Sequence, residues 1–513
     1  HLCSLHWGRR VGADSAMLAL LETKSPVFSL QEFERLRLEC PTANTGRFGE
    51  PAIEIRHSDG SRALDLRYVS HRVFPGKPAL AGLPATYAST EKEARTLELT
   101  LADTLPEPII QVVHCYSIFP EHDAIARSLH IRNLGSQPVV IERALSAAFT
   151  FPAREFEWLH LSGAWARERS VVRERVGTGL RSVGSVRGAS GHHANPFLAL
   201  GEPGFDEIRG EVFGCSLVYS GNHHMVLDTD SFGATSVLAG IHPQGFAWHL
   251  EPNESFQTPE AVLVYSGDGL GGLSRSYHRL YREHLVRGPW RDQRRPVTVN
   301  NWEATYFQFG ADDIKALARA SAPLGIELLV LDDGWFGKRD NPRSSLGDWT
   351  VDRRKLPDGL DTLAAVLAGE GLAFGLWFEP EMVSPDSELY RAHRDWCLHI
   401  PGRARTEGRH QLVLDFSREE VVEGVYRQME AVIESASVAY VKWDMNRYLS
   451  EVGSAGWPPE RQGEIFHRHI LGVYRLAGRL LEKFPALLIE GCAGGGGRFD
   501  PGMLFYCPQI WTS

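Results

Sequence analysis

The chain has 513 residues, of which 43% are hydrophobic and 23% charged, and its formal net charge is -10. This length is too great for one ordinary domain, so we expect two or three globular domains. The acidic balance argues against a nucleic-acid partner, which needs a concentrated basic surface, and no run of about 18 apolar residues is present to span a membrane.

The cysteines are few, odd in number and scattered. They are Cys3, Cys40, Cys115, Cys215, Cys397, Cys492 and Cys507. Such a set fits reduced thiols better than a disulfide framework. No signal peptide is visible, although the chain begins at His1 without a methionine. We therefore predict a cytoplasmic location.

Residues 1–268 have the pattern of an all-β domain. Short apolar runs such as Ile109–Phe119 and Ile125–Ile131 are separated by turn residues, and the second run alternates apolar with polar side chains. Alternation with period two is typical of half-buried strands. Many such runs predict a β-sandwich, and the domain is long enough for an extended or doubled pair of sheets.

Two histidine pairs occur in this domain, His192-His193 and His223-His224. Adjacent side chains on a strand point to opposite faces, so neither pair makes a good two-ligand metal site. We expect all four to be surface histidines in loops.

Residues 269–295 are predicted to form a linker helix. Apolar residues recur at helical spacing from Leu273 to His284, Ser274 is a candidate N-cap, and Gly288-Pro289 closes the segment.

Residues 296–513 change to a repeated order of strand, polar loop and helix, which predicts a parallel sheet, open or closed into a barrel. A closed (β/α)8 barrel has eight strands, and only six are found here. The candidates are Val297–Asn301, Glu327–Leu331, Ala373–Phe378, Val438–Trp443, Ala486–Ile489 and Gln509–Thr512.

The first five of these strands are each followed by a segment that carries a carboxylate, and most of these segments also carry a tryptophan. The segments are Asn300–Glu303, Asp332–Phe336, Trp377–Met382, Lys442–Arg447 and Glu490–Arg498. Indole rings stack on the apolar faces of sugars, while charged side chains bind sugar hydroxyls. Paired carboxylates also perform glycoside hydrolysis. The pattern therefore predicts a carbohydrate-active site at the carboxyl ends of the strands.

Asp444 is the candidate nucleophile among these carboxylates. Lys442 is two residues earlier, on the same side of the strand, and a nearby cation favours the ionised carboxylate. An ionised carboxylate suits a nucleophile or an electrostatic stabiliser. The alternative is a strand-end ion pair without chemistry.

The glycine run Gly494–Gly497 lacks the Lys-Ser/Thr ending of a phosphate-binding loop. Close approach of the backbone to a ligand explains the run better.

With these residues assembled, the chain resembles glycoside hydrolase family 36, the microbial α-galactosidases. The resemblance extends from Leu5–Arg10 to Gln509–Ser513, and its most specific matches are Leu331–Phe336, Lys442–Arg447 and Cys492-x-x-Gly495-x-x-Arg498. It implies an N-terminal β-supersandwich, a catalytic (β/α)8 barrel of the TIM type and a C-terminal β-sandwich. It also implies a retaining double displacement without a cofactor or a metal.

Residue by residue, the resemblance implies that Asp444 is the nucleophile. It implies that Asp332 and Asp333 hold the galactose 4- and 6-hydroxyls. The other implied sugar-binding residues are Lys442, Arg409 and Asn446 at the remaining hydroxyls, Cys492, Gly494 and Gly495 near the 2-hydroxyl, and Trp302 and Trp377 as aromatic walls.

The sequence departs from the family pattern in two places. The family's acid/base aspartate directly follows the Ile-Trp-Thr-Ser strand end, so it would come immediately after Ser513. We accordingly expect a chain truncated at both ends, with the first six barrel strands. In addition, Gly46-Arg47-Phe48-Gly49 stands where the family usually has Gly-Asp-Phe-Arg, in a loop that joins tetramers. A homo-oligomer is thus a possibility that the sequence leaves open.

The leading functional hypothesis is an α-galactosidase that acts on melibiose- or raffinose-type sugars. The alternatives are an α-N-acetylgalactosaminidase, a galactosyl-transferring relative, and a catalytically impaired galactose-binding fragment.

Overall fold

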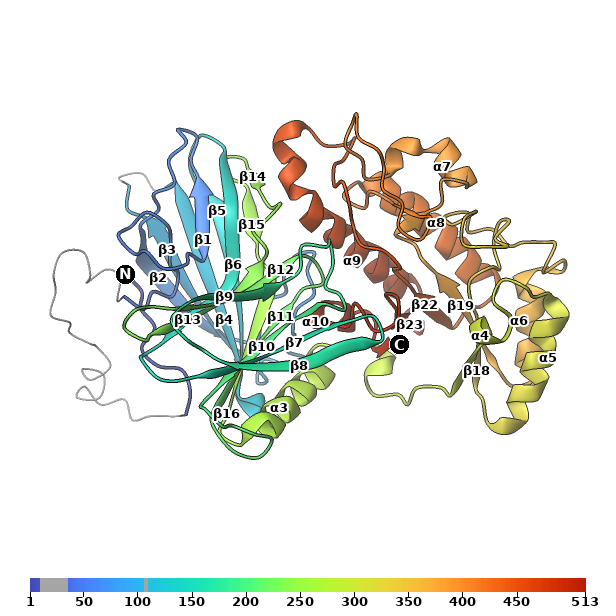
Figure 1. Ribbon diagram of the computed structural model, residues 1–513, viewed down its shortest axis with the longest axis horizontal. Helices are drawn as coiled ribbons and strands as arrows, with labels where there is room; N and C mark the ends of the chain where they lie inside the picture. The colour runs from blue at the N-terminus through green and yellow to red at the C-terminus, as the bar shows by residue number, and fades with distance from the viewer. Residues whose placement is uncertain (10–35, 106–108) are drawn as a thin grey trace.

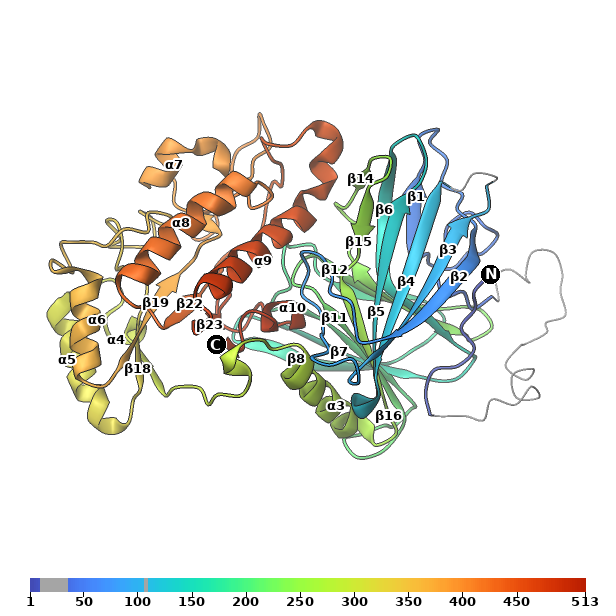
Figure 2. The same ribbon diagram turned by 180° about the vertical axis from the view of Figure 1, so that it is seen from behind.

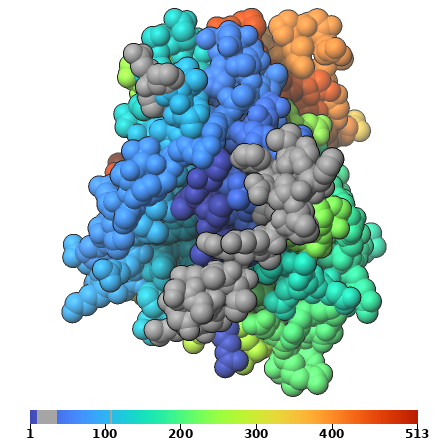
Figure 3. Space-filling model, turned by 90° about the vertical axis from the view of Figure 1, so that its left-hand side faces the viewer, coloured from blue at the N-terminus to red at the C-terminus, as the bar shows by residue number. Residues whose placement is uncertain are grey.

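The computed structural model describes residues 1–9, 36–105 and 109–513. A β-sandwich built from the first half of the chain lies beside a parallel sheet with its helices, built from the second half (Figures 1 and 2). The end of the molecule that lies away from the parallel sheet is covered mainly by the N-terminal half of the chain (Figure 3).

The sandwich consists of two antiparallel sheets. The smaller sheet has the order β1-β6-β13-β12-β9, with β14 beside β6, and the larger has the order β2-β3-β4-β5-β16-β11-β10-β7-β8, with β15 beside β5. The strands are β1 (Ile53–Arg56), β2 (Leu66–Pro75), β3 (Arg95–Asp103), β4 (Ile110–Phe119), β5 (Ala124–Asn133), β6 (Val139–Phe151), β7 (Glu157–Ala164), β8 (Arg167–Arg175), β9 (Gly179–Gly184), β10 (Ala194–Gly201), β11 (Val212–Val218), β12 (His223–Thr229), β13 (Thr235–Ile241), β14 (Trp248–Leu250), β15 (Ser255–Gln257) and β16 (Glu260–Ser266). The predicted large sandwich is confirmed.

Helix α3 (Gly269–His284) packs on the larger sheet, where Leu273 and Tyr277 join a buried apolar cluster. Ser274 lies inside the helix, so its prediction as the N-cap is wrong. The helix begins at Gly269, ahead of Ser274, because Leu270 N–H and Gly271 N–H donate to carbonyls of residues 206 and 207, each at 2.9 Å. After His284 the helix stops, and Pro289–Arg291 forms a separate 3₁₀ turn.

The predicted placement of the histidine pairs in surface loops is wrong for three of the four residues. His223 and His224 both lie in β12, where His223 is fully buried and His224 is half-buried. His192 is half-buried, and its Nε2 lies 2.8 Å from the carbonyl oxygen of Gly494, in the second half of the chain. Alternation along an apolar strand buries every second side chain, and this applies to histidine as well.

The second half of the chain contains one parallel six-stranded sheet, and all six predicted strands are confirmed. The strands follow one another in chain order: β17 (Thr298–Asn300), β18 (Leu328–Leu331), β19 (Ala373–Phe378), β22 (Tyr440–Trp443), β23 (Leu488–Gly491) and β24 (Gln509–Ile510). The helices are α4 (Trp302–Thr305), α5 (Ala311–Ser321), α6 (Gly359–Gly369), α7 (Glu388–Ala392), α8 (Glu419–Ser435), α9 (Ile465–Lys483) and α10 (Pro501–Leu504). A short antiparallel pair, β20 (Met382–Val383) and β21 (Leu412–Val413), lies outside the sheet. This is the incomplete (β/α)8 barrel of the prediction.

Strands β18, β22 and β23 are buried at every position. Burial on both faces is the normal condition of a parallel sheet between helices, and it explains their nearly continuous apolar sequences. The carboxyl ends of parallel strands lie at one edge of the sheet, and this edge carries the polar segments that follow them.

The sandwich and the parallel sheet are joined by buried polar contacts. Tyr219 Oη lies 2.9 Å from His467 Nδ1 on α9, and Ser220 Oγ donates to Asp500 Oδ1 at 2.6 Å, just before α10.

The domain boundaries at 268 and 295 stay predictions. Within the described residues no helix has the length and apolar character needed to cross a membrane. All seven cysteines are free thiols.

Candidate active site

A cavity of about 250 Å³ opens at the carboxyl ends of the parallel strands. All eleven residues that were predicted for the site line it: Trp302, Asp332, Asp333, Trp377, Arg409, Lys442, Asp444, Asn446, Cys492, Gly494 and Gly495. These residues lie at the carboxyl ends of five parallel strands or in the segments that follow them, so the parallel sheet is what brings them together. Their individual roles toward a sugar stay predictions.

Asp444 is only 7% exposed, and both of its carboxylate oxygens are bound. Asn446 Nδ2 and Trp377 Nε1 donate to Oδ2 at 2.6 and 3.2 Å. The backbone N–H groups of Met445 and Gly494 donate to Oδ1 at 2.9 and 3.3 Å. Several donors on one carboxylate hold it in a single orientation and favour its charged form.

The pKa of Asp444 lies below its ordinary value. Burial raises it, but the charge of Lys442 and hydrogen bonds from Cys492, Asn446 and Trp377 outweigh the burial. The expected effect of Lys442 on Asp444 is therefore present, although the direct ion pair of Lys442 is with Asp332, at 2.9 Å. Lys442 Nζ also lies 3.8 Å from the ring centroid of Trp511. The ion pair between Lys442 and Asp332 thus connects the carboxyl ends of β22 and β18.

Asp332 and Asp333 differ in their partners. Asp332 accepts hydrogen bonds from Lys442 and from Asn300 Nδ2, the latter at 2.6 Å. Asp333 forms a bidentate pair with Arg339, both bonds at 2.9 Å, and Arg339 is buried as well. Burial still raises the pKa of Asp333, against the lowering effect of Arg339. Each carboxylate is thus fixed by a cation before any ligand binds.

Glu379 is a buried carboxyl group that the sequence prediction did not assign to the site. Burial, together with the charge of Asp444, raises the pKa of Glu379 to about 8. Its Oε1 accepts from the Asn446 N–H at 2.5 Å, and its Oε2 lies 2.8 Å from the Gln411 side-chain nitrogen.

The side-chain oxygen of Gln411 is buried without a hydrogen-bond partner among the described residues. Reversing this amide would place its oxygen against the Glu379 carboxyl, where it could accept a proton that Glu379 carries. The surroundings of Glu379 therefore fit a neutral carboxylic acid.

The pKa of Glu381, two residues further on, is shifted in the opposite direction. Burial raises its pKa, but Arg498 and His469 reverse this and lower the pKa to about 2. Arg498 binds it through two hydrogen bonds of 3.0 and 2.8 Å. Arg498, the last residue of the glycine-rich motif, thus supports the loop from behind and does not line the cavity.

The sandwich also reaches the cavity. Trp165, on the turn between β7 and β8, lines it and is 71% exposed. Figure 1 shows this hairpin extending toward the carboxyl end of the chain. Arg169 Nη2 donates to the carbonyl oxygen of Gly496 at 2.9 Å, which fixes the hairpin to the glycine-rich loop.

Sequence reasoning missed six lining residues: Trp165, Glu303, Arg339, Glu379, Gln411 and Trp511. Glu303 and Glu379 are in the strand-end segments and could have been chosen from their position. Trp165 lies about 130 residues before β17, the first strand of the parallel sheet, and no local pattern in the sequence marks it.

Two protein-family models match the chain. Melibiase matches residues 255–513, and the glycosyl hydrolase family 36 N-terminal domain matches residues 1–251. Together they cover both structural halves.

Relatives and solved structures agree with these matches. α-Galactosidase AgaA of Geobacillus stearothermophilus is 50% identical over 523 residues, covering 100% of this chain and 71% of the relative. α-Galactosidase Mel36A of Lactobacillus acidophilus is 44% identical, covering 94% of this chain and 65% of the relative. A crystal structure of an AgaA variant from G. stearothermophilus in complex with raffinose has a TM-score of 0.96 at 50% identity, covering 100% of this chain and 72% of that one.

Proposed function

Because the chain belongs to glycoside hydrolase family 36, we propose that it carries the nucleophile and the sugar-binding wall of an α-galactosidase. The substrate class is oligosaccharides with terminal α-linked D-galactose. Raffinose and stachyose, found in complexes of AgaA variants, represent this class.

The observation that carries this proposal is the state of Asp444. It is ionised, fixed by side-chain and backbone donors, and placed in the cavity beside two further aspartates. In a retaining double displacement, a carboxylate oxygen attacks the anomeric carbon while the bond to the leaving oxygen breaks. An acid protonates that oxygen, and water then hydrolyses the glycosyl ester.

We assign the acid/base to the residue that the family pattern puts directly after Ser513. The position of Ser513 supports this assignment, because its Oγ accepts from the Gly496 N–H at 3.3 Å and Gly496 directly follows Gly495, which lines the cavity.

Sugar recognition follows from the charges and rings around Asp444. We propose that Asp332, Asp333, Lys442, Arg409 and Asn446 bind the hydroxyls, and that Trp302 and Trp377 form aromatic walls. Trp377 is almost fully buried, and its indole N–H binds Asp444. It therefore also orients the nucleophile. Gly494 and Gly495 adopt φ values of 59° and 82°, which glycine accepts without strain.

Cys492 discriminates between galactose and N-acetylgalactosamine in this proposal. Its thiol is 5% exposed and donates to Asp444, near the position expected for the sugar 2-hydroxyl. An N-acetyl group there would need space that the side chain fills. The alternative activity, that of an α-N-acetylgalactosaminidase, is thus disfavoured.

A cytoplasmic location is proposed from the free cysteines. Assembly into a homo-oligomer is a further proposal, since Phe48, in the loop where the sequence departs from the family, is 71% exposed.

The experiment compares hydrolysis of nitrophenyl α-galactoside and nitrophenyl α-N-acetylgalactosaminide by the protein and by its Asp444→Asn variant, which keeps the shape of the side chain. We expect turnover of the galactoside only, an α-configured first product by NMR, and turnover reduced to background in the variant. Turnover that survives in Asp444→Asn would refute the assignment of the nucleophile. A β-configured first product would refute the retaining mechanism.

A further inference from the structure

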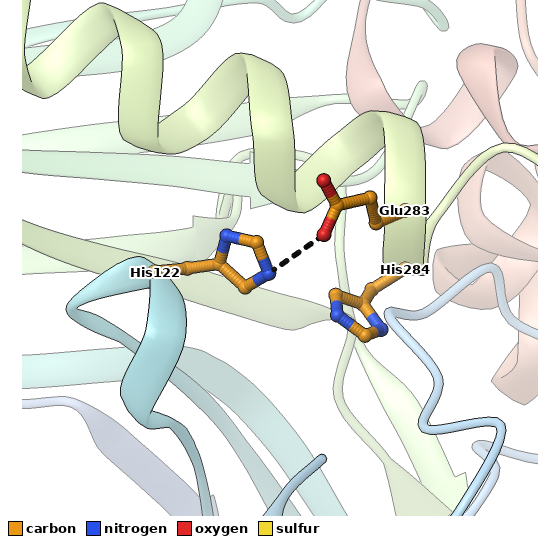
Figure 4. A group of neighbouring side chains, drawn as sticks. All are labelled: His122, Glu283 and His284. Carbon is orange, nitrogen blue, oxygen red and sulfur yellow. Dashed lines mark ion pairs between the residues drawn. The ribbon is translucent and has the colours of Figure 1, made fainter.

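Two histidines and a glutamate meet where the sandwich contacts helix α3, outside the active site. They are His122, from the 3₁₀ turn η1 (Pro120–His122), and Glu283 and His284, from the last turn of α3. One nitrogen or oxygen of each lies within 4.8 Å of those of the other two. Figure 4 shows the Glu283 carboxylate above the two imidazole rings and directed between them.

The His284 ring is held in place by a second segment of the sandwich. Its Nδ1 lies 3.0 Å from the carbonyl oxygen of Tyr87, and the N–H of Tyr87 in turn donates to the carbonyl oxygen of His284 at 2.8 Å. The Glu93 carboxylate lies 3.8 Å from the same Nδ1. A hydrogen bond from Nδ1–H to a carbonyl leaves the lone pair on Nε2, which is the arrangement typical of metal-binding histidines.

The separation of His122 from Glu283 suits a shared ion. His122 Nε2 and Glu283 Oε2 are 3.3 Å apart. Two ligands at about 2.0–2.1 Å from a tetrahedral zinc ion are separated by about 3.3 Å. His122 Nδ1 is buried and has no hydrogen-bond partner among the described residues. It can therefore carry the ring proton and leave Nε2 free to bind a metal.

Burial and charge at the cluster favour a cation. His122 and His284 are 4% and 7% exposed, so their positions are set by packing, while the exposed Glu283 can adjust to an ion. Glu283 and Glu121 act on His122 against the positive charge of Arg279.

We propose that His122, Glu283 and His284 form a zinc site that fastens helix α3 to the sandwich, with water completing the coordination. Imidazole nitrogen with one carboxylate oxygen is a donor set that zinc prefers, whereas Ca²⁺ and Mg²⁺ prefer oxygen ligands only. The site is structural, because it connects the helix that leads into the parallel sheet with two segments of the sandwich. It does not depend on the proposed catalytic activity.

The test is zinc binding by the full chain after removal of metals with a chelator. ZnCl₂ is titrated by calorimetry, and the melting temperature is measured with and without zinc. We expect one equivalent bound and a rise in melting temperature, with neither effect from MgCl₂. Glu283→Gln removes one ligand from an exposed position and should fold normally, and it should weaken zinc binding at least about tenfold, the lower end of what losing an outer-shell partner costs.

His278→Gln serves as the matched control, since His278 is an exposed histidine on the same helix. It should leave zinc binding and the rise in melting temperature unchanged. His122→Gln should lose both zinc binding and the rise in melting temperature. Absence of a stoichiometric zinc ion, or zinc affinity unchanged in Glu283→Gln, would overturn the proposal.

Discussion

Glu379 and Glu381 follow the same strand, and both are fully buried, yet their pKa values are displaced in opposite directions. This contrast makes a pair of matched substitutions informative. Glu379→Gln replaces a group that the structure holds as a neutral acid with a neutral amide of the same shape. The new amide can accept from the Asn446 N–H and donate to a reversed Gln411 side chain, so we expect it to be accommodated.

The sign and size of the effect of Glu379 on stability follow from its pKa values in the unfolded and folded states. The carboxyl titrates near 4.5 in the unfolded chain and near 8 in the folded protein. Between these pH values the folded state holds a proton that the unfolded state lacks, so the contribution of Glu379 to stability falls as pH rises. The difference corresponds to up to roughly 5 kcal/mol. Glu379→Gln does not titrate, and its stability relative to wild type should therefore rise from pH 5 to pH 8.5.

Glu381→Gln is the control with the opposite expectation. Its carboxylate, with a pKa of about 2, contributes stability above about pH 4.5 that is lost as pH falls toward 2. Removing the charge leaves Arg498 buried without its counter-ion, and such a loss costs about 3–5 kcal/mol. Glu381→Gln should therefore be strongly destabilised at both pH 5 and pH 8.5.

The assay is the apparent melting temperature of wild type and both variants in buffers from pH 5 to pH 8.5 at constant ionic strength. A difference between Glu379→Gln and wild type that does not change with pH would refute the neutral state of Glu379.

Three further outcomes follow from the cavity. Trp165→Ala should raise KM for raffinose about two- to tenfold, the equivalent of one ring contact, with less effect on KM for nitrophenyl galactoside. A KM for raffinose that is the same in the variant and in wild type, measured by steady-state kinetics, would contradict this. Cys492→Gly should raise the ratio of N-acetylgalactosaminide to galactoside hydrolysis, measured side by side, and an unchanged ratio would contradict the role of the thiol. Lys442→Met should destabilise the protein by about 3–5 kcal/mol in denaturant titrations because Asp332 is left buried without its cation, whereas a loss below 1 kcal/mol would show that Asp332 is otherwise compensated.

Much of the fold and of the cavity could be predicted because its signals are local. The six parallel strands are short apolar runs followed by polar segments, and each lies where the pattern put it. The eleven predicted site residues share one cavity for the same reason, since the carboxyl ends of parallel strands meet at one edge. The predicted family is confirmed by the models that match both halves.

The remaining features depend on contacts between distant segments. Ser274 was a reasonable N-cap, but contacts with residues 206 and 207 begin the helix at Gly269. Trp165 reaches the cavity only because the β7–β8 hairpin is fixed to the glycine-rich loop. The state of Glu379 depends on burial next to Asp444, and no sequence pattern reports burial of that kind.

The identity of the nucleophile is tested most directly by intact-mass labelling with an activated 2-deoxy-2-fluoro-α-galactosyl reagent, followed by peptide mapping. Such a reagent needs a nucleophile and little help from an acid. We predict a single adduct on the peptide that carries Asp444. An adduct on another carboxylate, such as Glu379, or no adduct in a folded chain that still binds galactose, would contradict the assignment.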